Sequence, residues 1–412
     1  MAFEQIKARA AAYHDDLIAF AQDLIRIPSL SGAEGPLAQR ILAELQKLRY
    51  DECGIDGIGN VVGILRGGDG PAVLYASHLD HVSPGDETQW EFPPYGAVIA
   101  GEFLHGRGAS DIKGAIACQV YAGAVARDLG LLGGHYIVGG IVQQESGGSV
   151  GIQHLIDVTL PEDTLKADLV ILGDPTNLDI CLGHRGRIEL NVTTVGRTAH
   201  ASAPWLGINA VYKMVPLVEA FEKLAKTLPA HALLEKSTLT VTNVESSPRR
   251  PSVIPDRCRM TVDRRFLPSE PAEEVIGQIQ AILNRLQTSD PTFKATVTIA
   301  VRQVTSYTGL TTDAAQSNPA FLTDEDHPYV QKVASALQES QGYAVFSKWY
   351  NGTAGSYTSG VRHIPTLGYA PGEEKYTHSP FDRVRISSLD AALAGYAALH
   401  LSVTGVTGPT QG

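Results

Sequence analysis

The sequence has few cysteines and no long run of basic residues. Four cysteines occur in 412 residues, and no two of them have a C-x-x-C spacing, which favours buried thiols in a reducing compartment over a disulfide framework. Lysine and arginine number 33 against 44 aspartates and glutamates, so the formal net charge is −11. Nucleic acids and anionic membranes bind to basic surfaces. We therefore expect neither as a partner.

Long apolar segments are missing as well. The first residues carry several charged side chains and no apolar core, so we expect no signal peptide. No stretch reaches the roughly 18–20 uninterrupted apolar residues of a membrane-spanning helix. With 43% hydrophobic and 19% charged residues, the chain has the composition of an ordinary globular protein with room for about two or three packed units. The prediction is a cytoplasmic protein.

The hydrophobic pattern predicts two kinds of domain. Helical spacing at 15–27 and 36–48 is followed by short apolar runs that alternate with helices, which predicts an α/β domain with a central mixed sheet flanked by helices. From Arg187 onward the order becomes strand, helix, strand, strand, helix, strand, which is typical of an α+β ferredoxin-like module. We predict a metal-binding catalytic domain of residues 1–186 and 303–412, with a dimerisation or lid domain inserted at 187–302.

Residues with metal-ligand chemistry follow several of the predicted strands. His78 and Asp80 come directly after an apolar run, and alternation points both side chains to one side, so that Asp80 can hold the second nitrogen of the His78 imidazole. Similar loops carry three more carboxylates and another histidine: Asp111, Glu145, Asp174 and His378. Any one of these residues could be explained as a polar residue at the end of a strand or as a helix cap. Together they form a ligand set for two divalent metals, one carboxylate bridging both.

These motifs resemble the di-zinc exopeptidase and amidohydrolase family, which includes acetylornithine deacetylase, succinyl-diaminopimelate desuccinylase, carboxypeptidase G and aminoacylase. The resemblance rests on H-x-D at 78–80, GRGASDIKG at 106–114, the acidic residue before S-G-G at 145–148, GDPTN at 173–177, His378, and the stretches 196–210 and 252–268. It covers the chain from about residue 15 to 398. Within the family, the chain is most similar to the branch of selenium-metabolism-linked hydrolases, through the segments GHRGRIEL (183–190), DRRF (263–266) and KWYNGTAG (348–355).

The resemblance implies a centre of two divalent metal ions, with zinc as the first candidate and cobalt or manganese as alternatives. One metal would be held by His78, Asp111 and Asp174. The other would be held by Asp111, Glu145 and His378, so that Asp111 is the bridge.

The resemblance also implies roles outside the ligand set. The peptide bond between Asp111 and Ile112 would be cis. His200 would reach the active site of a second subunit and stabilise an oxyanion there, which implies a homodimer through the inserted domain; an exposed loop histidine is the other reading. Arg265 is either a carboxylate-binding group or a salt-bridge partner at a strand end. With His200 and Thr353 it makes up the predicted substrate-binding set.

Two positions depart from the family pattern. Gln144 stands where the family has a glutamate that acts as the general base, and an amide cannot shuttle protons at neutral pH. Three interpretations of Gln144 remain. It is an engineered replacement of glutamate that traps substrate, the natural enzyme uses another residue as its base, or the chain has become a binding protein. We favour the first. Asp174 stands where many deacylases have glutamate, which weakly favours aminopeptidase or dipeptidase activity.

The predicted function is metal-dependent hydrolysis of amide-type C–N bonds in a small molecule, a dipeptide or an N-acyl amino acid. A metal-bridging hydroxide would attack the carbonyl carbon. The predicted catalytic residues are Gln144, in the general-base position, Asp80 and His200, and this chain would be impaired at Gln144. The alternatives are hydrolysis of a less usual C–N bond, by aromatic amine deamination or carbamoyl cleavage, and a non-catalytic metal-dependent binding protein.

Overall fold

The computed structural model describes residues 2–162 and 164–405, and the chain divides into two compact units. Unit 1 consists of Met1–Gly183, Gln303–Ala314 and Leu322–Gly412, and unit 2 consists of His184–Arg302 and Ala315–Phe321. The sequence-based division at residue 302 does not foresee the return of Ala315–Phe321 to unit 2. This return follows from strand β18 (Ser317–Asn318), because β18 pairs with β10 (Gly186–Val195) of that unit.

Unit 1 is built around a mixed sheet of eight strands in the order β1-β2-β6-β3-β7-β21-β8-β20. The strands are β1 (Glu52–Ile55), β2 (Val61–Leu65), β3 (Gly70–His78), β6 (Gly134–Ile141), β7 (Leu169–Leu172), β8 (Ile180–Cys181), β20 (Phe346–Ser347) and β21 (Thr366–Gly368). Strands β6, β3 and β7 are parallel neighbours. Their carboxyl ends therefore open at one edge of the sheet, where such sheets usually carry their sites.

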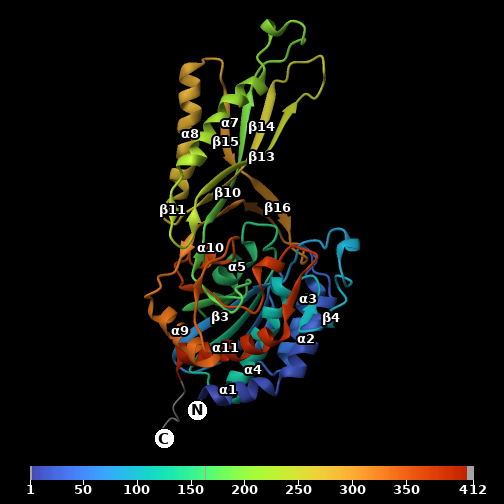
Figure 1. Cartoon of the computed structure of the whole chain (residues 1–412), viewed down its shortest axis with the longest axis vertical. Coiled ribbons are helices and arrows are strands. Elements are labelled where there is room, and N and C mark those ends of the chain that lie inside the picture. The colour runs from blue at the N-terminus through green and yellow to red at the C-terminus, as the bar shows by residue number, and fades with distance from the viewer. Residues whose placement is uncertain (1, 163, 406–412) are drawn as a thin grey trace. The chain divides into compact units, whose positions relative to one another are not determined.

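Helices cover this sheet, as Figure 1 shows for unit 1. They are α1 (Ala2–Ala11), α2 (His14–Arg26), α3 (Gly35–Lys47), α4 (Gly114–Asp128), α9 (Pro328–Gln341) and α11 (Ile386–Thr404). The apolar runs predicted as strands and the spacings predicted as helices fall on these elements, with ends shifted by a few residues. The predicted α/β class with a central mixed sheet is thereby confirmed.

Helix α11 is long and apolar enough to cross a membrane by length and composition, but 61% of its apolar window is buried inside the structure. It packs against α4 and α9. Leu389, Leu393 and Tyr396 are each fully buried. A helix that is apolar on all sides is expected in the core of a large domain, and this is the place that α11 occupies in unit 1.

Shorter elements complete unit 1. A three-stranded sheet contains β4 (Val98–Ala100), β5 (Phe103–His105) and β22 (Arg383–Arg385). A hairpin contains β16 (Val301–Thr305) and β17 (Thr311–Ala315), and its residues 303–314 belong to unit 1. The remaining helical segments are η1 (Glu87–Gln89), η2 (Ala109–Lys113), α5 (Val150–His154), η3 (Leu155–Thr159), α6 (Leu160–Glu162), α10 (Gly355–Thr358) and η5 (Glu374–Tyr376). None of these was predicted from the hydrophobic pattern, because each is too short to show a period.

Unit 2 is an antiparallel sheet in the order β13-β14-β10-β15, with helices α7 (Ala210–Thr227) and α8 (Ala272–Ser289) packed along it (Figure 1). The other strands are β13 (Thr238–Ser247), β14 (Arg257–Phe266) and β15 (Ala295–Ile299). Side chains of β10 alternate between buried and half-exposed along the strand, so one face of the sheet packs on the helices. The chain order and the spatial order are those of the predicted ferredoxin-like module.

Candidate metal centre

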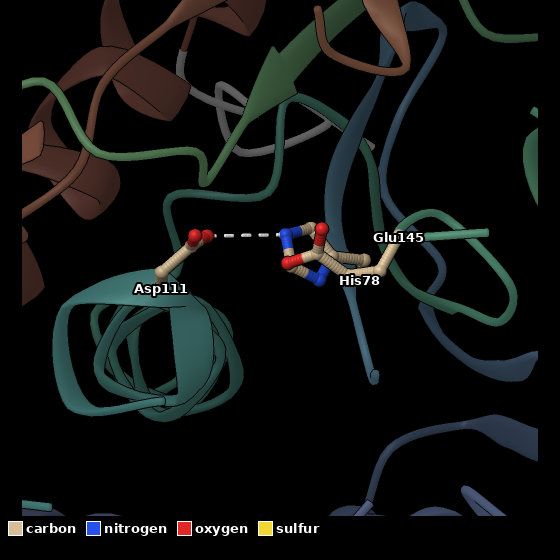
Figure 2. A group of neighbouring side chains, drawn as sticks. All are labelled: His78, Asp111 and Glu145. Carbon is tan, nitrogen blue, oxygen red and sulfur yellow. Dashed lines mark hydrogen bonds and ion pairs between the residues drawn. The ribbon is translucent and has the colours of Figure 1, made fainter. Parts of the chain in front are cut away.

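Three residues converge at the carboxyl edge of the unit 1 sheet. Figure 2 shows His78, Asp111 and Glu145 with their side chains turned toward one another. Each offers a ligand atom, and these atoms all lie within 4.8 Å of one another. The donors are one imidazole nitrogen and two carboxylate oxygens, which suit zinc and other borderline divalent metals. This group is the core of the candidate metal centre.

His78 is the last residue of β3 and is only 4% exposed. Its Nε2 atom lies 3.2 Å from Oδ1 of Asp111, the interaction drawn as a dashed line in Figure 2. Its Nδ1 atom lies 2.8 Å from the main-chain oxygen of Asp80 and 3.7 Å from the Asp80 carboxylate. The second nitrogen of His78 is therefore held by the carbonyl of Asp80, with its carboxylate beyond hydrogen-bond distance. This corrects the contact expected from the strand alternation.

Asp111 is supplied by the turn η2 that leads into helix α4. Its side chain is 7% exposed, and the peptide bond to Ile112 is cis, as the family resemblance implied. Gly108 in the same loop has a φ of +86°, a backbone conformation that glycine adopts without strain. The loop can therefore turn tightly before Asp111 and present its carboxylate at the edge of the sheet.

His378 brings a second imidazole from a distant part of the chain. Its Nε2 atom lies 3.1 Å from Oε1 of Glu145 and 3.3 Å from Oδ2 of Asp111. Its side chain is 49% exposed, whereas that of Glu145 is 18% exposed. Asp111 thus faces both histidines, one through each of its oxygens. A carboxylate placed in this way offers one oxygen to each of two neighbouring positions.

Asp174 follows β7 and is buried beside this group. Its charge interacts with those of His78, Asp111 and Glu145. Burial raises the pKa of Asp174 to about 7, and the nearby Asp111 carboxylate adds to the increase.

The charges of the site act strongly on one another. Burial lowers the pKa of His78, but its hydrogen bond with Asp111 raises that pKa well above the usual value. Hydrogen bonds with Asp111 and Glu145 raise the pKa of His378 to about 10. The carboxylates of the site therefore favour positive charge on the two imidazoles beside them. Because divalent cations would supply the same positive charge to the same donors, the residues present fit a metal site.

The Asp80 carboxylate organises the loop that follows β6. It accepts hydrogen bonds from the N–H groups of Gln144 at 3.1 Å and of Glu145 at 2.9 Å. It also accepts a hydrogen bond from the hydroxyl of Ser31 at 2.6 Å. Gln144 and Glu145 both lie beyond the end of β6, which stops at Ile141. The backbone at Gln144 and Glu145 is therefore held by a side chain of the loop after β3.

Three residues make up the predicted substrate-binding set. In unit 2, His200 is exposed, and its Nδ1 atom lies 2.6 Å from the hydroxyl of Ser202. Arg265 donates through Nε to Asp263 at 2.7 Å, which gives it a salt-bridge partner on its own strand. In unit 1, Thr353 is 1% exposed, and its hydroxyl accepts a hydrogen bond from the N–H of Gly355. Substrate binding by these three residues stays a prediction.

Two buried carboxylates near the site were missed by the sequence reasoning. Glu34 is fully buried and accepts a hydrogen bond from the N–H of Gln143 at 3.1 Å. Burial raises its pKa to about 7, and Asp80 adds to the increase. Asp382 is 1% exposed and binds the loop that carries Asp111. Neither residue has a spacing that marks it, although Asp382 follows His378 by four positions.

Comparisons with known proteins place this fold in a family. Residues 182–291 match the model of a peptidase dimerisation domain. The chain is 34% identical over 404 residues to the protein of Escherichia coli K12 named Uncharacterized protein YgeY, covering 97% of each chain. It is 31% identical over 261 residues to succinyl-diaminopimelate desuccinylase of Alkalilimnicola ehrlichii, covering 60% of this chain and 68% of that protein.

A solved structure agrees in fold over nearly the whole chain. It is the YXEP protein of Bacillus subtilis, described as a dinuclear metal binding peptidase from the M20 family. The TM-score is 0.70 at 14% identity, covering 95% of this chain and 98% of that one. The resemblance predicted from the motifs is thereby confirmed, since the dimerisation module, the desuccinylase relative and the fold all match the same family. The chain belongs to the M20 family of metallopeptidases and amidohydrolases.

Proposed function

We propose that this chain is built to hydrolyse the amide-type C–N bond of a small molecule, a dipeptide or an N-acyl amino acid, with two divalent metals. The observation that carries the proposal is the convergence of His78, Asp111 and Glu145 with His378 at one edge of the sheet. The desuccinylase relative removes an acyl group, by its name, and the related YXEP fold belongs to a peptidase. Both names describe cleavage of a C–N bond.

The proposed ligands divide between two metals. His78, Asp111 and Asp174 would hold one ion, and Asp111, Glu145 and His378 would hold the other. Each ion would have one imidazole and two carboxylates as ligands, a set that binds zinc and also cobalt or manganese. When bound, such ions polarise a carbonyl oxygen and lower the pKa of water. The protein positions Asp111 between the histidines and keeps His78 and Asp111 almost dry.

Gln144 decides how well this chain completes the reaction. Its backbone is held by Asp80 beside Glu145, but its amide side chain can only donate or accept a hydrogen bond and cannot carry a proton between water and a leaving nitrogen. We propose that binding persists in this chain while the proton transfer is impaired. Gln144 also supports the second candidate function, a non-catalytic metal-dependent binding protein.

We further propose that the chain forms a homodimer through unit 2. Helix α7 and the preceding turn η4 (Pro204–Leu206) expose large apolar side chains that we call the α7 patch: Trp205, Leu206, Tyr212 and Val215. Trp205 is 76% exposed and Tyr212 is 73% exposed. Clustered exposed apolar side chains mark interaction surfaces, and the matched dimerisation module supports a second copy of this chain as the partner. In such a dimer, His200 would serve the active site of the other subunit.

We also propose a cytoplasmic location. All four cysteines are free, and Cys118, Cys181 and Cys258 are buried. Unpaired thiols are compatible with a reducing compartment.

The experiment that tests the proposed function measures metal and turnover together. The metal-free protein is loaded with Zn²⁺, Co²⁺ or Mn²⁺, the bound metal is counted, and release of amine is followed on a panel of dipeptides and N-acyl amino acids. We expect two metals per chain in the wild type and one in His378→Ala. His363→Ala, which changes an exposed histidine of the same unit, should keep both. Equal metal content in all three proteins would contradict the ligand assignment.

A further inference from the structure

A buried carboxylate outside the predicted ligand set connects two of the loops that carry ligands. Asp382 lies four residues after His378, just before β22, and is 1% exposed. Its carboxylate accepts a hydrogen bond from the N–H of Gly108 at 2.7 Å and from the N–H of Ser110 at 2.9 Å. Ser110 is the residue directly before Asp111. The Asp382 side chain therefore holds, through two hydrogen bonds, the backbone of the loop that carries Asp111, the proposed bridging ligand.

Further bonds join the same two segments. The main-chain oxygen of Asp382 accepts a hydrogen bond from the N–H of Gly106 at 3.0 Å. The hydroxyl of Ser110 donates to the main-chain oxygen of Arg383 at 2.7 Å and accepts a hydrogen bond from the N–H of Glu373 at 3.2 Å. The segment around His378 is thus tied to the segment before Asp111 on both sides of Asp382. A shift of one segment must displace the other.

The charge of Asp382 has a dedicated partner. Arg107, which is 3% exposed, donates through Nη1 to Oδ2 of Asp382 at 3.1 Å, and its guanidinium lies over the ring of Trp90 at 4.9 Å. Hydrogen bonds to a charged group are stronger than neutral ones, and a low dielectric strengthens them further. The Arg107 contact therefore holds the Asp382 carboxylate where it accepts the N–H groups of Gly108 and Ser110.

We propose that Asp382 is a positioning residue of the metal centre, which holds the Asp111 loop and the His378 loop at the separation that a shared cation needs. The inference rests on the proposed function, because it takes Asp111 and His378 as ligands. It adds a residue from outside the proposed ligand set. Outer groups that orient ligands typically change metal affinity by 10–100-fold when they are replaced.

The test compares Asp382→Asn with the wild type in titrations of the metal-free protein with Co²⁺, whose visible absorption reports the ligand geometry. The asparagine keeps the size of the side chain, but its NH₂ group must face an N–H donor or the guanidinium of Arg107. We expect Co²⁺ affinity to fall 10–100-fold for the more weakly bound ion, with a changed visible spectrum. Unchanged affinity and spectrum would overturn the inference.

Glu270→Gln is the matched control. Glu270 is a buried carboxylate that accepts hydrogen bonds from Arg264 and from the N–H of Leu267, and it lies in unit 2, which carries none of the proposed ligands. This variant should lower stability while leaving Co²⁺ affinity and spectrum as in the wild type. If it weakens metal binding as much as Asp382→Asn does, the effect is general destabilisation and the inference is wrong.

A milder variant keeps the test decisive if Asp382→Asn does not fold. Ser110→Ala removes the hydroxyl that bonds to Arg383 and Glu373 but leaves the buried ion pair intact. We expect a several-fold loss of Co²⁺ affinity and a smaller spectral change; a wild-type titration curve in this variant would overturn the inference. A wild-type protein that binds no metal would contradict the proposed function itself, whereas normal binding in both the wild type and the variants contradicts only the role of Asp382.

Discussion

The carboxylate of Asp80 accepts a hydrogen bond from the N–H of Glu145 at 2.9 Å, so the residue two positions after His78 holds the loop that carries another proposed ligand. The same carboxylate accepts hydrogen bonds from Gln144 and Ser31. Three donors from two loops converge on one side chain. Asp80 therefore connects the carboxyl ends of β3 and β6, which are parallel neighbours in the sheet.

Replacing Asp80 with asparagine should weaken metal binding without removing a ligand. The asparagine can offer only one oxygen to the N–H groups of Gln144 and Glu145, and its NH₂ group would face a donor. We expect metal affinity to fall about 10–100-fold with stoichiometry retained at saturating metal. Calorimetric titration of the metal-free protein measures both quantities. Asp86→Asn, which changes an exposed aspartate of the same unit, should bind metal like the wild type.

The sequence predicted the two architectures of the fold because long apolar runs and helical spacing are local signals. Helices α2 and α3 lie where the spacing at 15–27 and 36–48 placed them, within a few residues. The predicted ligands were recognisable because histidines and carboxylates at strand ends are rare enough to notice together. Short elements such as β22 and β5 carried no such signal, and they pair only after segments far apart in the chain meet.

The hydrogen bonds that support the site could not be predicted in the same way. Ser31, Glu34 and Asp382 come from loops without period, and each acts on a main-chain N–H or on a carboxylate of another loop. Main-chain donors look alike in every sequence, so no residue pattern marks them. The contact of His78 with the carbonyl of Asp80 could not be predicted for the same reason. The acceptor is a main-chain oxygen, and a sequence motif specifies only side chains.

Gln144→Glu should restore the missing proton carrier. We expect the single-turnover rate of hydrolysis to rise about 10²–10⁴-fold, the usual contribution of one acid–base group, with similar metal content and substrate affinity. The two proteins are compared on the same panel of dipeptides and N-acyl amino acids. Gln46→Glu, which adds a carboxylate at an exposed position of α3 in the same unit, is the control for added negative charge and should not accelerate turnover. No gain in Gln144→Glu on any substrate that binds would show that Gln144 belongs to another mechanism or to a binding protein.

Charges placed in the α7 patch should dissociate the proposed homodimer. Trp205→Asp and Tyr212→Asp each put a carboxylate where an apolar side chain would be buried by a second copy, and central aromatic contacts often contribute about 2 kcal/mol or more. Sedimentation velocity over a range of concentrations should show a dimer for the wild type and a shift toward monomer for the variants. Leu310→Asp changes an exposed apolar residue of unit 1 and should leave the dimer intact. Dimers of unchanged affinity in both patch variants would exclude this surface.

His400 should make stability fall as the pH is lowered. The side chain is fully buried in unit 1 beside the rings of Tyr75 and Tyr136, and burial lowers its pKa to about 3. In the unfolded chain the histidine has an ordinary pKa near 6.5. Between pH 6.5 and pH 3 the unfolded state therefore binds a proton that the folded state does not, so the free energy of unfolding rises with pH in this range. The contribution is fully present above pH 6.5 and is lost as the pH falls toward 3.

The comparison of wild type with His400→Leu isolates this effect, because leucine has a similar volume and does not titrate. Other histidines and carboxylates change the stability of both metal-free proteins equally, so only the difference between them is interpreted. From pH 7.5 to pH 5 the wild type should lose about 2 kcal/mol more than the variant, at 1.36 kcal/mol per pKa unit. Urea denaturation at several pH values measures this difference. A difference that stays constant with pH would mean that His400 can take up a proton in the folded protein, and the dry environment inferred for it between β3, β6 and α11 would be wrong.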